Sequence, residues 1–384
     1  MRFPEFTDEW RSKKLGDLSD VTKLAGFEFT KYVNYSDNGN IIALRGVNIK
    51  KNKLDLTDVK YIDNSDFNKL NRSKLYPGDL LFTYVGTIGN VALIFKKNKY
   101  YLAPNVCRIR SESFINSQFL KFYFNTQLIK KEINRYVTKS SQPALSMENI
   151  RKFNVNIPNI KEQNKIANFI SLIDRKIDLL EKTLCLHQKF IEGLKESIFS
   201  NLNYPKFKLN NFMKISKIKC NDNINKRLTV KLNLKGIVPR ETKTTEKEGV
   251  TTQYIRKKGQ FIYGKQNLYK GAFGIIPKEL DGYMSSSDIP SFDFINNKLN
   301  PYWFYYFISR KNYYSRLEKY STGTGSKRIS PEEFLNIKIP LTPIEKQNNQ
   351  VKMFNKLIER QNILIKEKEY LYNFKKGLLQ KMFV

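Results

Sequence analysis

The stretch from Glu162 to Phe199 constrains this chain most, because it carries the repeat of a long coiled-coil helix. Its aliphatic residues recur in alternating steps of four and three over more than four heptads, with one interruption at His187. No proline breaks the run before Pro205. A helix of about 37 residues spans roughly 55 Å, and its apolar seam needs a partner to cover it. The seam consists of Ile166, Ile170, Ile173, Ile177, Leu180, Leu184, Ile191, Leu194 and Ile198.

The charge of the chain indicates a polyanionic partner. Lysine and arginine number 68 against 36 acidic residues, which gives a formal net charge of +32 in 384 residues. Nucleic acid or an anionic membrane would attract such a chain. The sequence has no apolar run of about 18 residues and no apolar signal region, so we expect no membrane partner.

The cysteines predict neither a disulfide framework nor a zinc site. Cys107, Cys185 and Cys220 are odd in number and far apart, whereas both kinds of site need clustered or paired thiols. Reduced thiols are the simpler interpretation, and we expect a cytoplasmic protein.

Residues 1–158 have the pattern of a mixed α/β domain. Short apolar runs at 41–44, 80–84, 91–95 and 107–110 predict strands, and glycine-rich turns separate them. Helical spacing follows over about 116–137, then a polar loop, and then a last strand that ends at Pro158.

The same plan recurs at a constant offset of 184 residues. Gln163-Asn164 matches Gln347-Asn348, and the strand before each helix ends in Ile-Pro. Near the end of each helix Phe190, Gly193, Leu194 and Phe199 match Phe374, Gly377, Leu378 and Phe383. The predicted organisation is therefore a first globular domain at 1–158, a long helix at 159–203, a second globular domain at 204–341 and a second long helix at 342–384.

The second long helix is the natural partner of the first. Its seam is poorer, because Gln361, Lys368 and Lys375 occupy seam positions. Since a whole domain lies between the helices, they can pair antiparallel within one chain. The predicted fold class is α/β (α+β), with two globular domains separated by two antiparallel coiled-coil helices and related by a pseudo-twofold axis.

Two segments resemble nucleotide-handling motifs, and in each a structural interpretation is preferable. Gly259 to Gln266 spells most of a phosphate-binding loop, but its middle residues suit a buried strand and the final Ser/Thr is missing. Asn300-Pro301-Tyr302-Trp303 resembles part of a methyltransferase motif, but asparagine followed by proline also begins a helix.

The sequence shows no convincing catalytic constellation. His187 is the single histidine and falls on the seam, where it is better explained as a polar residue that sets helix register. We predict no catalytic residue, no metal site and no cofactor site in this chain.

Polar and basic loops remain as candidate DNA contacts, because Arg, Lys, Asn and Gln read base edges while Lys, Ser and Thr hold phosphates. A single surface lysine is usually only solvated, but a polar basic loop precedes the last strand in both copies. In the first domain the predicted contacts are Arg45, Asn48, Lys50, Lys51, Thr83, Tyr84, Thr87, Asn90, Lys139, Ser140, Ser141 and Gln142. In the second domain they are Arg240, Lys243, Lys265, Gln266, Asn267, Tyr269, Lys270, Thr324, Ser326, Lys327 and Arg328.

Over essentially its full length the chain resembles the DNA-specificity subunit of type I restriction-modification systems. The order of several modest motifs, with a long helix after each copy, carries the resemblance. The motifs are Trp10 with Leu15-Gly16-Asp17-Leu18, Arg45-Gly46-Val47-Asn48-Ile49, Pro77-Gly78-Asp79-Leu80-Leu81, Gly86-Thr87-Ile88-Gly89, Ile157-Pro158 with Glu162-Gln163, and Ile339-Pro340 with Glu345-Lys346-Gln347.

The resemblance implies a non-catalytic subunit that reads double-stranded DNA. Each globular domain would be a target-recognition domain for one half of a bipartite asymmetric site. The helices would bind two methyltransferase (modification) subunits, and two restriction (motor-nuclease) subunits would complete a restricting complex. S-adenosylmethionine, ATP and Mg²⁺ would belong to those partner subunits. The second domain departs from the family pattern, because Gly259-Gln260 replaces Gly-Asp and the Gly-Thr-x-Gly step is missing.

Two alternatives stay open at this stage. A self-contained DNA methyltransferase or nuclease would need a cofactor motif that the sequence does not display. A scaffold that mimics DNA should be acidic, whereas this chain is strongly basic.

Overall fold

The computed structural model describes residues 1–97, 99–138, 141–200, 202–220, 226–240, 252–323 and 327–383. The chain divides into two compact units, Met1–Glu181 with Glu367–Val384, and Lys182–Lys366. Both long helices are divided between the units, because each globular domain packs against a part of each helix. None of the helices described is long and apolar enough to cross a membrane.

A four-stranded antiparallel sheet lies at the centre of the first unit. Its order is β2 (Ser19–Lys23), β10 (Val106–Ser111), β7 (Leu80–Thr83) and β8 (Val91–Leu93). Side chains alternate along a strand, so Leu80 and Phe82 join one core while Leu81 joins another on the opposite face. All four residues of β7 are therefore buried, which explains its continuous apolar run.

A smaller sheet and a hairpin cover the Leu81 side. The sheet is β6 (Lys60–Tyr61), β3 (Ile42–Leu44) and β9 (Tyr100–Leu102), in which β3 and β9 run parallel. β4 (Ile49–Lys50) and β5 (Lys53–Leu54) form the hairpin. The parallel pair brings two segments together that are almost 60 residues apart, which the local pattern did not predict.

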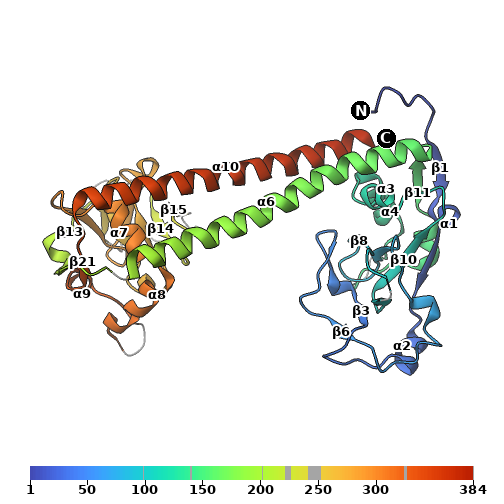
Figure 1. Ribbon diagram of the computed structural model, residues 1–384, viewed down its shortest axis with the longest axis horizontal. Coiled ribbons are helices and arrows are strands. Elements are labelled where there is room, and N and C mark those ends of the chain that lie inside the picture. Colours follow the sequence, from blue (N-terminus) through green and yellow to red (C-terminus); the bar gives the residue numbers. More distant parts are fainter. Residues whose placement is uncertain are drawn as a thin grey trace. The chain divides into compact units, whose positions relative to one another are not determined.

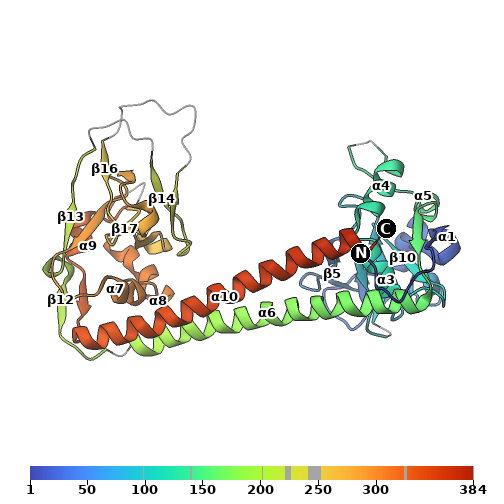
Figure 2. The same ribbon diagram turned by 90° about the horizontal axis from the view of Figure 1, so that it is seen from above.

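Of the remaining elements of the first unit, α2 (Gly26–Tyr32) packs on the Leu81 side through Phe29 and Tyr32, and the others lie on the Phe82 side or close the domain. β1 (Arg11–Lys14) pairs with β11 (Asn154–Ile157), so the first and last strands of the domain are neighbours. Ser146 caps the helix before β11 through the Asn149 N–H. The helices are α1 (Leu15–Leu18), α2 (Gly26–Tyr32), α3 (Ser117–Tyr123) and α4 (Gln127–Tyr136), labelled in Figure 1, and α5 (Met147–Arg151), labelled in Figure 2.

The second unit repeats this frame. Its four-stranded sheet has the order β13 (Met213–Ser216), β20 (Ser291–Phe294), β17 (Phe261–Tyr263) and β18 (Phe273–Ile275), and β12 (Lys206–Lys208) pairs with β21 (Lys338–Pro340). The other strand pairs are β14 (Leu228–Val230) with β15 (Ile237–Pro239) and β16 (Gln253–Ile255) with β19 (Met284–Ser286). Its helices, labelled in Figure 2, are α7 (Pro301–Ile308), α8 (Lys311–Tyr314) and α9 (Pro331–Leu335).

Two motif interpretations are confirmed in the second unit. The segment that resembles a phosphate-binding loop contains β17, whose three residues are buried. Asn300 caps α7 by accepting the N–H groups of Tyr302 and Trp303, with Pro301 in the first turn.

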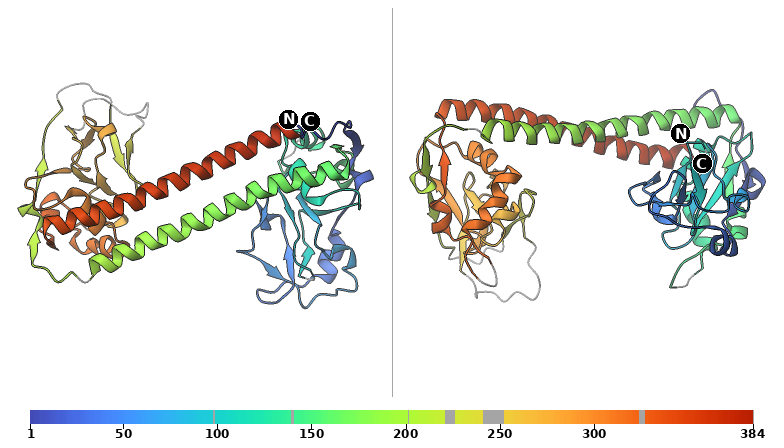
Figure 3. Two further views of the ribbon diagram at one scale, coloured as in Figure 1. Left: turned by 45° about the horizontal axis from the view of Figure 1, so that its top comes forward. Right: turned by 60° about the horizontal axis from the view of Figure 1, so that its bottom comes forward.

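The long helices, drawn in Figures 1 and 3, are α6 (Ile160–Ser200) and α10 (Ile344–Met382). In the first unit the early part of α6 meets the late part of α10, where Lys375 Nζ donates to Asp174 Oδ1 at 2.5 Å. In the second unit the late part of α6 meets the early part of α10, where the rings of Phe199 and Phe354 stack. The pair is therefore antiparallel, as the sequence predicted.

The predicted seam is the buried face of α6. Ile166, Ile170 and Ile177 are at most 2% exposed. Burial is weaker along the middle of α10, where the polar seam residues Gln361, Lys368 and Lys375 are half-buried, as are the apolar ones Leu357, Leu364 and Leu371. His187 is also half-buried, and its ring nitrogens have no hydrogen-bond partner among the described residues.

One hydrogen-bond network joins each domain to the start of its long helix, and it is the same in both copies. The Asn116 N–H donates to Oε1 of Gln163. The Nε2 of the same glutamine donates to the carbonyls of Phe114 and Pro158. In the second copy the same bonds join Asn300, Gln347, Lys298 and Thr342. Both glutamines are buried, so the 184-residue repeat includes the joint between domain and helix.

Candidate nucleic-acid interface

Several of the predicted contacts in the first domain line one cleft. Its volume is about 560 Å³, and three segments that are distant in sequence form its walls. Arg45 to Lys50 supply one wall, the loop from Thr83 to Asn90 supplies another, and Pro104-Asn105 closes the third. The aromatic side chains of Phe29 and Tyr35 complete the lining. The cleft thus offers both polar groups and apolar surface.

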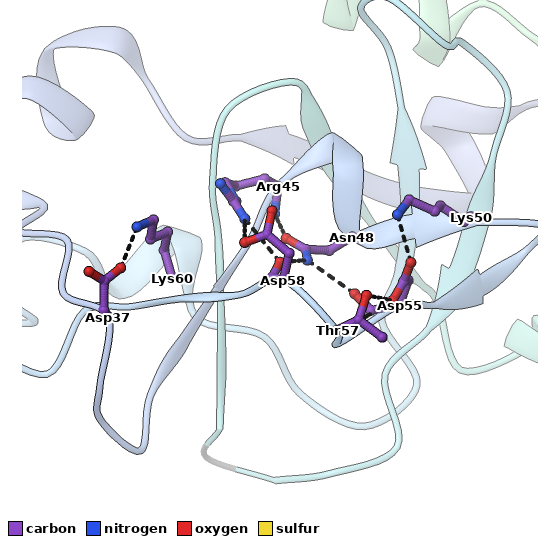
Figure 4. A network of polar contacts seen from close by, with 8 residues as sticks. All are labelled: Asp37, Arg45, Asn48, Lys50, Asp55, Thr57, Asp58 and Lys60. Carbon is purple, nitrogen blue, oxygen red and sulfur yellow. Dashed lines mark hydrogen bonds and ion pairs between the residues drawn. The ribbon is translucent and has the colours of Figure 1, made fainter. Parts of the chain in front are cut away.

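Arg45 is held by a carboxylate at one wall of the cleft. Its Nη2 donates to the Asp58 carbonyl at 3.0 Å and lies 3.2 Å from Asp58 Oδ1 (Figure 4). Its Nε is buried and has no partner in the described part of the chain. The side chain as a whole is 23% exposed, so Asp58 fixes the direction of a guanidinium that is only partly open to the cleft.

Asn48 does not fit the predicted role of a base-reading residue. Its side chain is 1% exposed. Its Oδ1 accepts the Arg45 N–H, and its Nδ2 donates to the carbonyls of Asp55 and Asp58 (Figure 4). All its polar groups therefore hold the Arg45–Asp58 segment in shape, and we reassign Asn48 as a positioning residue.

The hairpin that follows presents basic side chains around a tight turn. Lys51 and Asn52 have positive φ of 49° and 60°, and the Asn52 side chain anchors the turn by accepting the Val91 N–H. Lys51 is exposed. Lys50 donates to Asp55 Oδ2 at 2.7 Å (Figure 4), and together with Thr57 it lowers the pKa of the Asp55 carboxyl well below its usual range.

The loop from Thr83 to Asn90 is shaped by its first residue. The Thr83 hydroxyl donates to the Thr87 carbonyl at 2.6 Å and accepts the Asn90 N–H at 3.0 Å, and the side chain is 2% exposed. Gly86 has φ of +74°, which a side chain would strain. Thr87 is exposed and Asn90 half-buried. Thr83 is thus a second positioning residue, and Thr87 stands outward.

Tyr84 is also less available than predicted. The residue is 9% exposed, and the Lys23 ammonium lies over its ring at 5.4 Å. The neighbouring polar loop does reach this region, because the Gly86 N–H donates to the Pro143 carbonyl. Ser141 and Gln142 of that loop are exposed, whereas Lys139 and Ser140 lie outside the described residues.

In the second domain Lys265 occupies the position of Tyr84. The Lys265 N–H donates to the Asp288 carbonyl, and its own carbonyl accepts the Ile329 N–H. The Tyr84 backbone makes the corresponding bonds with Asn105 and Leu145. A basic side chain therefore stands where the first domain has a buried aromatic ring.

The other predictions for the second domain fall on a varied surface. Gln266 and Lys270 are exposed, Asn267 is half-buried, and Lys270 lies over the Tyr269 ring at 5.6 Å. Arg328 pairs with Asp288, and Lys327 pairs with Glu318. Arg240 is exposed. Lys243, Thr324 and Ser326 lie outside the described residues.

The second domain has Gln260 where the first has Asp79, but the backbone around the two residues has the same conformation. In the first domain Asp79 accepts the Tyr76 N–H and both Nε and Nη2 of Arg110. In the second, Gln260 accepts the Lys257 N–H and donates to Asp293 Oδ1 at 2.7 Å. The preceding glycines have similar positive φ, +93° and +82°. An ion pair has become an amide–carboxylate pair with the carboxylate on the other strand.

Local patterns did not point to every lining residue. Phe29, Tyr35 and Asn105 line the first cleft, but they lie in segments without a polar repeat. Asn105 has φ of +70°, which asparagine tolerates better than most residues. Only the strand order of the folded domain brings them beside Arg45.

This fold, with its duplicated domains, paired helices and polar clefts, can be compared with known proteins. Residues 7–185 and 200–370 each match the type I restriction modification DNA specificity domain, and the chain belongs to that family. It is 22% identical to a protein of Methanocaldococcus jannaschii assigned as the type I restriction enzyme MjaX specificity subunit, over 98% of this chain and 93% of that one. It is 26% identical to the type I restriction enzyme EcoKI specificity subunit of Escherichia coli K12, over 51% of this chain and 45% of that one.

The fold also matches a solved structure. The crystal structure of the type I restriction-modification S subunit from M. genitalium aligns with a TM-score of 0.61 at 13% identity, covering 100% of this chain and 99% of that one. The family resemblance noted in the sequence is thus confirmed. The chain is a DNA-specificity subunit, and nothing in these comparisons favours a self-contained methyltransferase or nuclease.

Proposed function

We propose that this chain reads a bipartite, asymmetric site in double-stranded DNA, with each globular domain recognising one half. The family supplies the class of function. One observation carries the division of labour: the two domains share a sheet order and a helix joint, but their candidate contact loops differ in length and residue type. The net charge of +32 supplies phosphate affinity without sequence preference. Discrimination then comes from the loops, at about 1–3 kcal/mol per base pair.

A domain exchange tests this proposal. Residues 207–338 are replaced by the second domain of a relative, which leaves Thr342 and Gln347 in place, while the new domain supplies the positions of Lys298 and Asn300 in the helix joint. The recognised site should then change in one half and keep the other, as measured by methylome sequencing of cells that carry the chimera and its partners. A change in both halves, or in neither, would contradict the one-domain, one-half-site division.

We expect the long helices to bind two modification subunits. Large apolar side chains are exposed on the long helices of both compact units, and two pairs among them stand at equivalent positions: Leu186 and Phe190 on α6, and Tyr370 and Phe374 on α10, each 41% to 67% exposed. The two pairs are again 184 residues apart. Because exposed apolar residues of this size favour protein association, two equivalent positions support the binding of two copies of one partner.

A stoichiometry measurement tests the docking positions. Phe190→Lys should remove one modification subunit from the complex, Phe374→Lys should remove the other, and the double variant should bind neither, as read by native mass spectrometry. Lys189→Ala, an exposed neighbour on α6, is the matched control. Retention of both subunits by the double variant would refute this assignment.

The chemistry then belongs to the partner subunits. S-adenosylmethionine would bind the modification subunits, and ATP with Mg²⁺ would serve two restriction subunits where these are present. The His, Cys, Asp and Glu side chains of the described residues form no group suited to a metal ion. We place the complex in the cytoplasm, where its DNA substrate is found.

A further inference from the structure

A second, smaller cavity lies in the second domain and differs in character from the cleft of the first. Its volume is about 260 Å³. Its walls come from the end of β13, the residues after β16 and β17, the turn before β20 and the start of α9, elements that Figure 2 shows together in this domain. The lining includes Ser216, Lys217, Arg256 and Lys265, with Glu332 as the one carboxylate among the described lining residues.

Arg256 supplies a buried positive charge to this cavity without a carboxylate partner. The residue is 1% exposed. Its Nε donates to Ser285 Oγ at 2.7 Å, and its Nη atoms donate to the Ser291 hydroxyl and to backbone carbonyls. No ion pair involves it in the described part of the chain. Burial lowers its pKa to about 10, so the guanidinium stays charged and its charge is not neutralised.

Ser216 supplies a polar group without a partner. The residue is 5% exposed, and its hydroxyl makes no hydrogen bond with the described residues. A buried hydroxyl that lacks a partner is destabilising, and a bound acceptor would remove that cost. Its carbonyl accepts from Arg256 Nη1 at 3.2 Å, so the hydroxyl and the buried cation are adjacent.

The first domain differs at the equivalent position. Tyr84 corresponds there to Lys265, and its buried ring lies under the Lys23 ammonium. In the second domain a lysine side chain takes the place of that aromatic ring and lines the cavity. The cation that Lys265 contributes to the cavity is thus a property of the second domain.

We propose that this cavity binds a phosphate group. Lys217, Lys265 and the Ser216 hydroxyl are its direct partners, and Arg256 is the positioning residue that keeps the site positive. The volume accommodates one such group with a few waters, each of which occupies about 30 Å³. The phosphate can come from the DNA backbone or from free phosphate. The first source rests on the function proposed above, and the second does not.

The test uses the full chain and three single variants. Lys265→Ala removes a direct cation and Ser216→Ala removes the unpartnered hydroxyl, while Lys278→Ala is the control, since Lys278 is exposed and lies outside the cavity. Affinity for the cognate duplex is measured over a range of salt concentrations. If the site holds a DNA phosphate, Lys265→Ala reduces the slope of log K against log salt by about one relative to the control, and Ser216→Ala weakens binding several-fold.

The second arm needs no DNA. Thermal melting is followed in sodium phosphate and in sodium chloride at equal ionic strength. If the site takes free phosphate, phosphate raises the Tm of wild type and of Lys278→Ala, and this gain is lost in the other two variants. A DNA effect alone assigns the backbone as the source, and a melting effect alone assigns the free anion.

Other results would overturn the proposal that the cavity binds phosphate. If both test variants match Lys278→Ala in both arms, the cavity holds no phosphate. A Ser216→Ala variant that melts below wild type in chloride would show that the hydroxyl has a partner in the fold, and it would remove Ser216 from the assignment. Wild-type protein without sequence-specific DNA binding would contradict the proposed function instead, and the melting arm would still decide the cavity.

Discussion

The two globular domains have the same frame but do not present the same surface. Both hold a four-stranded sheet of equivalent order and join their long helix through the same buried glutamine network. They differ beside the third strand of the sheet. The first domain has the glycine loop around Thr87 and a buried Tyr84, and the second has Lys265 and a cavity. The shared parts are thus the sheet order and the joint between domain and helix, and the divergent parts lie beside the third strand, at buried as well as exposed positions.

The largest expected effect tests whether the two joints are equivalent. Gln163→Ala and Gln347→Ala each remove three hydrogen bonds at buried sites, and unmet buried partners cost about 1–3 kcal/mol each. We expect each variant to lose about 3 kcal/mol of unfolding free energy, measured by urea denaturation. Exposed Gln188→Ala is the control. Losses that differ by more than about 1.4 kcal/mol, a factor of ten in the unfolding constant, would contradict equivalence.

The next prediction concerns the polar pair that differs between the domains, Asp79 with Arg110 in the first and Gln260 with Asp293 in the second. Asp79→Asn removes the charge that faces Arg110, a contact in which Asp79 is buried and Arg110 keeps 39% exposure. We expect a loss of about 1–2 kcal/mol, below the range of fully buried pairs because the arginine is partly solvated.

The reciprocal change in the second domain should depend on pH. Gln260→Glu places a second carboxylate beside Asp293, which Gln260 Nε2 contacts at 2.7 Å in the wild type. Repulsion disfavours two ionised carboxylates, so protonation of one relieves it. The destabilisation should be larger at pH 8 than at pH 4.5, as measured by denaturation at both values. A pH-independent loss would show that packing, not charge, distinguishes the two domains.

A smaller effect concerns recognition. Thr87→Ala should relax one base pair of the first half-site by about 1–3 kcal/mol, and Gln266→Ala should act only on the second. Binding to duplex libraries with single positions varied measures both changes. Relaxation in the wrong half-site would break the correspondence between domain and half-site.

The smallest effect is expected in the helix pair. The contact between Asp174 and Lys375 is about three-quarters buried on each side, while Lys176 and Glu367 are 59% and 38% exposed. We expect a coupling energy of about 1 kcal/mol for the first pair and below about 0.5 kcal/mol for the second, measured by double-mutant cycles. Equal couplings would show that burial does not set the strength of these pairs.

Periodic features of the fold were predictable from the sequence. The heptad seam identified α6, the 184-residue offset identified α10, and the Asn300-Pro301 pair marked the start of α7. These signals are local or repeat at a fixed distance, so no knowledge of tertiary contacts was needed.

The candidate site was predictable only in part, because burial of polar residues depends on distant segments. Asn48 and Thr83 lie in polar loops and were predicted as contacts, but the segments around Asp58 and Asn90 enclose them. Conversely, Arg256 carries no sequence signal, since its environment is assembled from serines about 30 residues further along the chain. Contact residues in the second domain were harder to choose because the Gly-Thr-x-Gly step of the first domain has no counterpart there.

The glutamine joint has a consequence for how such genes can change. The stretches from Pro158 to Gln163 and from Thr342 to Gln347 make equivalent hydrogen bonds through their glutamines. A domain that is joined to a long helix within either stretch therefore finds the same donors and acceptors. Recombination with crossovers in these short stretches would exchange one domain and leave the joint chemistry intact. New specificity can therefore arise by reassortment of whole domains, without concurrent change in the long helices.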